Sequence, residues 1–104
     1  MKLTGKCKND FIEFLLNTDC KYSLNIEEGQ LVSDAFFECH LSMQYGVYVD
    51  FFDSVGLRIG VSPVFENDFW VYLNNEEIND IDFKTRPEAR TAAIKKANEI
   101  YNAQ

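Results

Sequence analysis

The chain has 104 residues, of which 46% are hydrophobic and 26% charged, and it carries a net charge of −7 at pH 7. These proportions exclude a disordered or repetitive protein and predict one globular domain over residues 1–104. No apolar run approaches the roughly 20 residues that span a bilayer, and the first residues lack the apolar core of a secretory signal. We therefore expect a soluble, cytoplasmic protein that does not bind membranes.

The first predicted element is a helix of about 12 residues that ends near Asn17, with Thr4 or Asp10 as its N-cap. Its apolar side chains recur at the helical period and form a wide arc, which predicts a helix packed firmly into the core. The arc consists of Cys7, Phe11, Ile12, Phe14 and Leu15.

The stretch that follows has weaker patterns. Tyr22–Ile26 is compatible with a short strand, Glu27–Gly29 with a turn, and Ser33–His40 with one or two helical turns capped by the serine. Phe36 and Phe37 are both expected to be buried, because large aromatic side chains favour the interior.

A β-hairpin is predicted next, with strands over residues 46–52 and 57–62. Side chains two apart along a strand share a face, so pairing Phe51 with Ile59 keeps the aliphatic side chains of both strands together. This register leaves a three-residue loop, in which Gly56 takes the left-handed conformation that such a loop requires.

Two further strands are predicted after the hairpin. The pair Ser62-Pro63 is expected to end the second strand, because proline has no backbone N–H to donate to the sheet. The third strand, Phe69–Leu73, repeats the alternation of apolar and aromatic side chains. Asn74-Asn75 is expected to form a tight turn, since asparagine tolerates left-handed geometry. A weaker fourth strand returns over residues 77–83.

The last element is a helix that begins at Thr85, where TRPE is a capping box with proline in the first turn. Its apolar stripe is rich in alanine, which predicts a close approach to the sheet. The stripe contains Ala89, Ala93, Ile94, Ala97, Ile100 and Tyr101, whereas Lys95 and Lys96 lie off it. The elements together predict an α+β fold, an antiparallel meander of three or four strands with the N-terminal and C-terminal helices packed on one face.

Negative charge is concentrated in the middle of the chain, where residues 27–82 contain twelve acids and one base, Arg58. Such a chain repels phosphate backbones, so we expect no direct binding of nucleic acid. An acidic surface can instead attract a basic protein, imitate nucleic acid in a basic groove, or simply keep the protein soluble.

The sequence contains no recognisable catalytic or metal-binding motif. Asp50 and Asp53 would lie about 10 Å apart on opposite faces of a strand, which is unsuitable for a pair of catalytic carboxylates. Three cysteines, Cys7, Cys20 and Cys39, lack the spacing of a zinc site, and His40 beside the last of them points the other way on an extended chain. We therefore expect no cofactor, no metal and no enzymatic activity.

The face of the sheet that the helices leave open is the predicted interaction surface. It combines aromatic side chains with an Asp–Arg pair, a composition typical of protein interfaces. Its residues are Tyr48, Asp50, Phe52, Arg58, Trp70 and Tyr72. This face could contact a second copy in a homodimer, a foreign protein or a small ligand, or it could be covered by residues 18–44.

Three blocks of the sequence also resemble a known group of proteins. They are LTGKCKNDFIEFL (Leu3–Leu15), SMQYGVYVDFFDSVG (Ser42–Gly56) and TRPEARTAAIKKANEIYN (Thr85–Asn102). They look like small uncharacterised proteins carried by phages and integrated prophages of gut-dwelling anaerobic bacteria. The resemblance implies an accessory protein of a mobile element and transfers no site.

These observations favour a small, acidic, non-enzymatic protein-interaction module, acting on a protein partner or on itself. The two alternatives are an acidic mimic of nucleic acid that blocks a basic groove of a host DNA-acting protein, and a small hydrolase or metal-binding protein.

Overall fold

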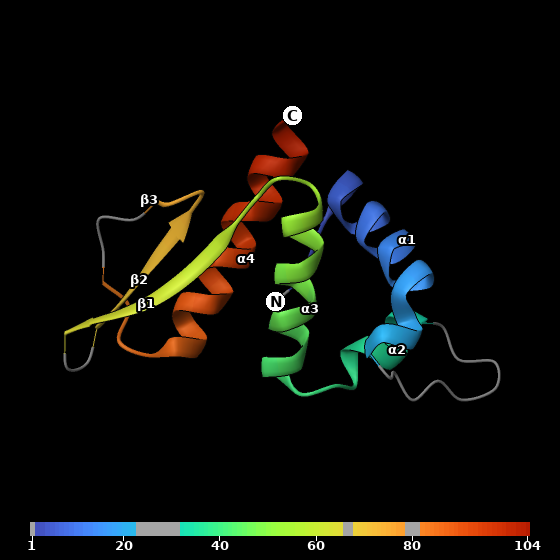
Figure 1. The fold of residues 1–104 in the computed structure, drawn as a ribbon, viewed down its shortest axis with the longest axis horizontal. Coiled ribbons are helices and arrows are strands. Elements are labelled where there is room, and N and C mark those ends of the chain that lie inside the picture. The colour runs from blue at the N-terminus through green and yellow to red at the C-terminus, as the bar shows by residue number, and fades with distance from the viewer. Residues whose placement is uncertain (1, 23–31, 66–67, 79–81) are drawn as a thin grey trace.

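The computed structural model describes residues 2–22, 32–65, 68–78 and 82–104. Over these ranges it contains four helices and a three-stranded antiparallel sheet of order β1-β2-β3 (Figure 1). The elements are α1 (Gly5–Tyr22), α2 (Val32–Phe37), α3 (Leu41–Ser54), β1 (Ile59–Phe65), β2 (Asp68–Leu73), β3 (Glu76–Glu77) and α4 (Arg86–Ala103). The predicted α+β class and the antiparallel meander are confirmed.

Helix α4 covers one face of the sheet. β1 pairs with β2 so that Val61 lies opposite Val71, and the side chain of Val71 is fully buried against Ala89 and Ala93 of α4. The small alanine side chains let the helix approach the strands closely, as their spacing predicts. The alternation predicted for β2 is also correct, because Val71 and Leu73 are both buried on the side of the helices.

The strand predicted over residues 46–52 is wrong, because this segment belongs to helix α3. Its buried positions recur three and four residues apart, which is the helical period. They are Gln44, Val47, Tyr48, Phe51 and Phe52. A helix places these large side chains on one side, where they meet α1, α2 and α4, whereas a strand would turn half of them away from the core.

Gly56 has the predicted left-handed conformation, with φ of +87°, but it ends a helix instead of forming a hairpin loop. The backbone N–H of Leu57 donates to the carbonyl of Phe52 at 2.8 Å, and that of Gly56 donates to the carbonyl of Asp53 at 3.2 Å. These two bonds form a Schellman motif, and the apolar pair that accompanies it is Phe52 with Leu57, both buried. The hairpin predicted over residues 46–62 is therefore replaced by a helix, a Schellman ending and an edge strand.

Strand β1 begins at Ile59 and runs through Pro63, where the sequence predicted its end. The backbone of Arg58 bonds to Asn74. Because backbone groups alternate in direction along a strand, the backbone N–H and C=O groups of Gly60 and Ser62 also point toward β2. The nitrogen of Pro63 consequently faces the free edge of the sheet, where the missing donor costs no ladder bond.

The return strand is shorter than the predicted segment 77–83. β3 comprises Glu76–Glu77 alone, and Phe83 forms an isolated bridge with Phe69. Residues 79–81 lie outside the described residues. The tight turn before β3 is confirmed, since Asn74 and Asn75 have φ of +53° and +71°, values that a two-residue hairpin turn requires.

The capping box predicted at the start of α4 is confirmed at its first residue. The hydroxyl oxygen of Thr85 accepts a hydrogen bond from the backbone N–H of Glu88, and Pro87 lies in the first turn. Lys95 and Lys96 are exposed, as expected for positions off the apolar stripe.

Helix α1 continues to Tyr22, so it is longer than predicted, and Tyr22 does not begin a strand. The remainder of the strand predicted at Tyr22–Ile26, and the turn at Glu27–Gly29, lie outside the described residues. The one or two helical turns predicted over Ser33–His40 correspond to α2, but α2 ends at Phe37 and begins at Val32, so Ser33 lies inside the helix and is not its N-cap. Phe36 is fully buried, but Phe37 is 46% exposed, contrary to the expectation that both are buried.

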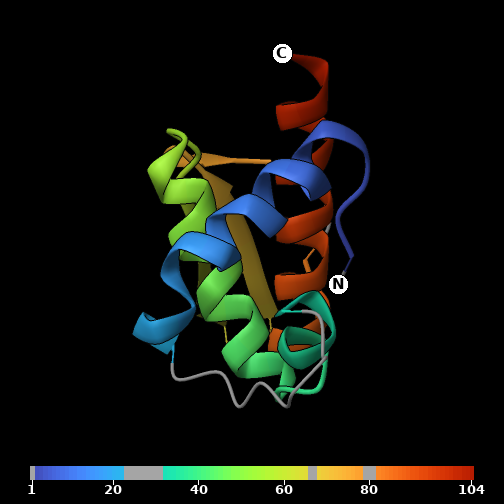
Figure 2. The same cartoon turned by 90° about the vertical axis from the view of Figure 1, so that its right-hand side faces the viewer.

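Aromatic rings pack against one another between α1, α2 and α3. The ring centroid of Phe11 lies 4.8 Å from that of Tyr48, 5.1 Å from that of Phe36 and 5.4 Å from that of Phe51. Figure 2 shows α1 lying across α3. Burial of Tyr48 raises the pKa of its phenol, since the charged form is poorly solvated there.

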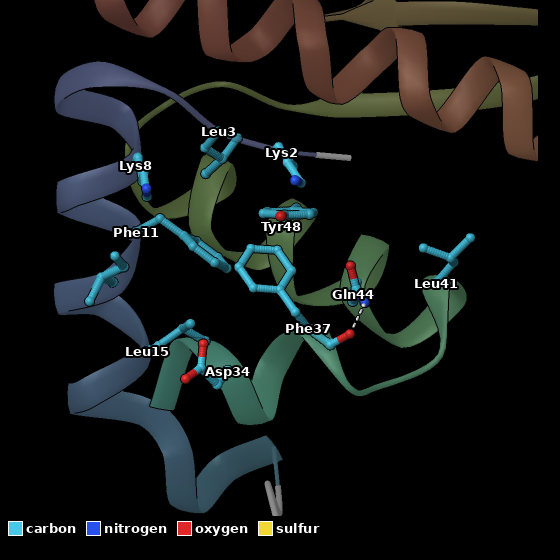
Figure 3. Close-up of a pocket in the computed structure, with 11 residues that line it drawn as sticks. Lys2, Leu3, Lys8, Phe11, Leu15, Asp34, Phe37, Leu41, Gln44 and Tyr48 are labelled. Carbon is cyan, nitrogen blue, oxygen red and sulfur yellow. Dashed lines mark hydrogen bonds between the residues drawn. The ribbon is translucent and has the colours of Figure 1, made fainter. Parts of the chain in front are cut away.

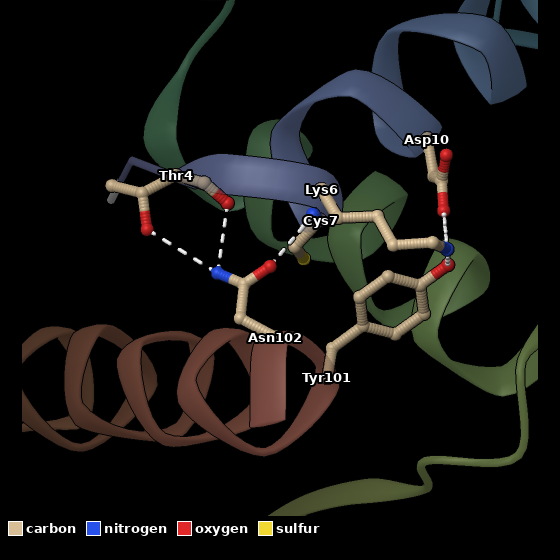
Figure 4. Close-up of polar contacts among 6 residues, drawn as sticks. All are labelled: Thr4, Lys6, Cys7, Asp10, Tyr101 and Asn102. Carbon is tan, nitrogen blue, oxygen red and sulfur yellow. Dashed lines mark hydrogen bonds and ion pairs between the residues drawn. The ribbon is translucent and has the colours of Figure 1, made fainter. Parts of the chain in front are cut away.

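Two asparagines of α4, Asn98 and Asn102, cap the N-terminus of α1, and Figure 4 shows the bonds of Asn102. Asn98 accepts from the backbone N–H of Thr4 at 2.9 Å and donates to the Thr4 hydroxyl at 3.0 Å. Asn102 accepts from the backbone N–H of Cys7 and donates to the carbonyl of Thr4, both at 2.9 Å. Helix α1 is therefore anchored to α4, through which it is connected to the sheet.

Replacing Asn98 by alanine should destabilise the protein by about 1–3 kcal/mol, because a buried amide that holds the Thr4 backbone and hydroxyl is lost. The change in the free energy of unfolding, measured in urea, checks this. Glu99→Ala, at an exposed neighbour on the same helix, is the control and should change it by about 0.5 kcal/mol or less. Equal effects of the two substitutions would contradict the capping role.

Candidate functional site

The structure separates the six residues predicted to form one interaction surface. Tyr48 and Phe52 are 0% exposed on α3 and belong to the core, so their assignment to the open sheet face is wrong. Asp50 is also on α3, where it is half-buried, and it cannot form the cross-strand pair expected with Arg58. All three residues were predicted on the sheet because residues 46–52 were predicted to be a strand, whereas they belong to helix α3.

The other three residues do lie on one face of the sheet. In the register of β1 and β2, Gly60 is opposite Tyr72 and Ser62 is opposite Trp70, and Arg58 continues the same alternation. We call the set Arg58, Trp70, Tyr72 and Glu77 the outer sheet face. Helix α4 packs on the reverse side, and Figure 1 shows no helix of the described segments over the outer sheet face. The rings of Trp70 and Tyr72 have their centroids 6.5 Å apart.

Each of these two aromatic residues has an acidic neighbour. The indole N–H of Trp70 donates a short hydrogen bond to Asp82, and Glu77 lies directly across from Tyr72 on β3. A third acid, Asp68, is paired with Lys84 at 2.7 Å, and this hydrogen bond raises the pKa of the lysine. Aromatic faces with adjacent carboxylates attract cationic side chains through both the ring quadrupole and the charge.

The acids of the middle segment do not gather into one array in the described part of the chain. Asp34 is on α2 and Asp53 at the end of α3, whereas Asp68 and Glu76 are on the sheet. The molecule is 46 Å long, with α2 near one end and the sheet near the other (Figure 1). Mimicry of a phosphate backbone would need carboxylates side by side on one surface.

The separation expected between Asp50 and Asp53 is also corrected by the helix. Residues three apart on a helix are neighbours on the same side, whereas the strand reading put them on opposite faces. Neither carboxylate lines a cavity that the structure forms between α1, α2 and α3, next to Phe37 and Gln44.

The described cysteines are packed rather than grouped around a site. Cys7 is fully buried in the core, and burial raises the pKa of its thiol to about 11, which opposes formation of a reactive thiolate. The thiol of Cys39 donates to the carbonyl of Ala35 at 3.5 Å, while His40 is exposed at the start of α3. The side chain of Cys20 lies outside the described residues. Within the described part, no three His, Cys, Asp or Glu side chains are grouped to hold a metal ion.

A polar cluster between α1 and α4 was not predicted from the sequence. The Asp10 carboxylate accepts hydrogen bonds from the ammonium of Lys6 and the hydroxyl of Tyr101, and the ammonium also lies 4.9 Å from the tyrosine ring centroid (Figure 4). Only the spacing of Lys6 and Asp10 is visible in the sequence, because Tyr101 is 91 residues away from the aspartate. The pKa of Asp10 is lowered mainly by the hydrogen bond from Lys6 and, to a smaller extent, by the hydrogen bond from Tyr101.

No family model, curated protein or solved structure matches this chain. Its function must therefore be inferred from the geometry of its own residues. Among the described residues, no helix is both long enough and apolar enough to cross a membrane.

The polar cluster of Lys6, Asp10 and Tyr101 predicts how the stability of the protein depends on pH. Because the pKa of Asp10 is lowered in the folded protein, its contribution is present above the unfolded value of about 3.9 and is lost as pH falls below it. The pKa of Lys6 is raised by the same bond, so its contribution is lost only at alkaline pH, above about 10.4. The stabilisation should therefore be complete between about pH 5 and pH 9.

Asp10→Asn should accordingly be less stable than the parent protein at pH 7, and the difference should shrink as pH is lowered toward 3. Urea unfolding at successive pH values measures it. Glu13→Gln, at an exposed acid of the same helix, serves as the control. A difference for Asp10→Asn that stays constant down to pH 3 would show that the charge of Asp10 is irrelevant.

Proposed function

We propose that this protein is a non-enzymatic interaction module that uses the outer sheet face to bind an exposed basic segment of a partner protein. The observation that carries the proposal is that each aromatic residue on that face has an acidic neighbour. The indole N–H of Trp70 donates to Asp82, and Tyr72 lies opposite Glu77 in the register of β2 and β3. An arginine or lysine of the partner stacks on a ring and is neutralised by the adjacent acid.

The overall charge supports a basic partner. At −7, the protein attracts a cationic segment from a distance, which speeds encounter at low ionic strength. Two copies meeting through this face would bring Glu77 and Asp82 of both copies into one interface, where only the two Arg58 side chains of this face offset four acids, and excess like charge in an interface opposes association. A foreign partner is therefore favoured over a homodimer.

Of the alternatives, the nucleic-acid mimic has less support from the described chain, because its acids lie on α2, α3 and the sheet instead of one surface. The resemblance to phage and prophage proteins remains a prediction. If it is correct, the module acts in the cytoplasm of a bacterial host, and its partner is a phage or host protein.

The single tryptophan of the chain, Trp70, reports directly on this face. A nine-residue oligoarginine should change its fluorescence on binding, and the affinity should fall as salt is added. Tyr72→Ala and Glu77→Gln should each weaken binding about two- to fivefold, the range of one exposed cation–π contact or one surface ion pair.

Glu99→Gln, which removes the same charge from α4, is the matched control and should leave binding unchanged apart from a small effect of net charge. Oligoglutamate of the same length should not bind. If Glu99→Gln weakened binding as much as Glu77→Gln, the net charge of the protein alone would explain the binding, and the proposal would be contradicted. Sedimentation equilibrium showing a dimer disrupted by Tyr72→Ala would assign the face to self-association instead.

A further inference from the structure

The structure contains a concave surface, away from the outer sheet face, which the proposed function does not use. It is a cavity of about 660 Å³ between α1, α2 and α3 (Figure 3). This volume is in the range of pockets that take small-molecule ligands. Its lining residues are Lys2, Leu3, Lys8, Phe11, Ile12, Leu15, Asp34, Phe37, Leu41, Gln44 and Tyr48.

The walls of the cavity are mainly apolar. The rings of Phe11 and Tyr48 pack at a tilt with their centroids 4.8 Å apart, and Phe37 turns its ring toward them in Figure 3. Two apolar side chains at the cavity remain largely in solvent, Phe37 at 46% exposure and Leu41 at 62%. An apolar ligand would cover part of this exposed surface, a favourable change of about 25 cal/mol per Å².

Gln44 fixes one wall of the cavity. Its side-chain amide is buried and donates to the carbonyl of Cys39 at 2.9 Å and to that of Phe37 at 3.3 Å. These bonds hold the turn between α2 and α3. The wall is therefore formed before any ligand arrives, which reduces the entropy lost on binding.

The charges at the cavity are unevenly distributed. Lys2 and Lys8 lie at one end and Asp34 at the other (Figure 3). Two cations at one cavity are notable in a chain with a net charge of −7. An anionic group is attracted to the lysine end and repelled from the aspartate end, so the cavity selects both the charge and the orientation of a ligand.

We propose that this cavity binds a small amphipathic carboxylate, with its hydrocarbon chain against the exposed apolar side chains Phe37 and Leu41 and its carboxylate between Lys2 and Lys8. The ligand enters an existing apolar space, so hydrocarbon length and the negative charge contribute separately to affinity. This site is distinct from the outer sheet face, and either proposal can fail without the other.

Isothermal titration calorimetry with decanoate, below its micelle concentration, tests the site on the intact protein. Decanoate should bind more tightly than decanol and much more tightly than decyltrimethylammonium. Shortening the chain to octanoate should weaken binding about fourfold for each methylene removed, as expected for burial of hydrocarbon.

Lys2→Gln and Lys8→Gln should each weaken decanoate binding about two- to fivefold and leave decanol binding unchanged. Lys96→Gln, the same change at an exposed position of α4 that does not line the cavity, is the matched control. Asp34→Asn should leave decanoate affinity unchanged or slightly higher, since it removes the repulsive charge. All of these positions are exposed, and circular dichroism should show an unchanged fold.

Three results would overturn the proposal. They are decanol binding as tightly as decanoate, decyltrimethylammonium binding more tightly than either, and no binding by any of the three probes. Equal loss of decanoate affinity in Lys8→Gln and Lys96→Gln would also overturn it, because the charge would then act without regard to its position.

Discussion

The fold depends on one packing arrangement, in which the aromatic side chains of α3 meet those of α1 and α2. Phe11 contacts Phe36, Tyr48 and Phe51, each with ring centroids within 5.4 Å. Edge-to-face and tilted aromatic pairs of this kind add about 0.5–1.5 kcal/mol each to the area that they bury. The packing requires Tyr48 and Phe51 on one side of their segment, and a helix provides this because residues three apart are neighbours.

Once α3 is a helix, the aromatic residues of the chain divide into two groups. Tyr48 and Phe52 belong to the core, while Trp70 and Tyr72 remain on a sheet face that no described helix covers. The amide groups of Asn98 and Asn102 then anchor α1 to α4, which already packs on the reverse face of the sheet. The open sheet face and the cavity thus lie in different layers of the molecule, and each has its own charge environment.

The sequence predicted an element correctly where its apolar residues followed only one period, either that of a helix or that of a strand. Thr85 and the alanine stripe identify α4, and the alternation in Phe69–Leu73 identifies β2, so Trp70 and Tyr72 were placed on the correct face. The run at 46–52 is different, because nearly every residue in it is apolar. Val47 and Phe51 fit both a strand of period two and a helix of period 3.6, and β-branched residues favour the wrong choice.

The signal at Gly56 was equally ambiguous, because a left-handed glycine closes either a hairpin loop or a Schellman motif. The decisive information is tertiary, namely that α1 and α2 present rings to one side of α3. The cavity and the Lys6–Asp10–Tyr101 cluster were not predictable for a similar reason. Their members come from separate helices, and no local spacing in the chain relates them.

Backbone NMR of residues 41–54 tests the central claim most directly. The account predicts helical ¹³Cα shifts throughout this segment, together with nuclear Overhauser contacts from the Tyr48 ring to the rings of Phe11 and Phe36. Strand-like shifts over residues 46–52, with cross-strand contacts between Phe51 and Ile59, would contradict it. Tyr48 and Phe52 would then return to the open sheet face, and the cavity between the three helices would not exist.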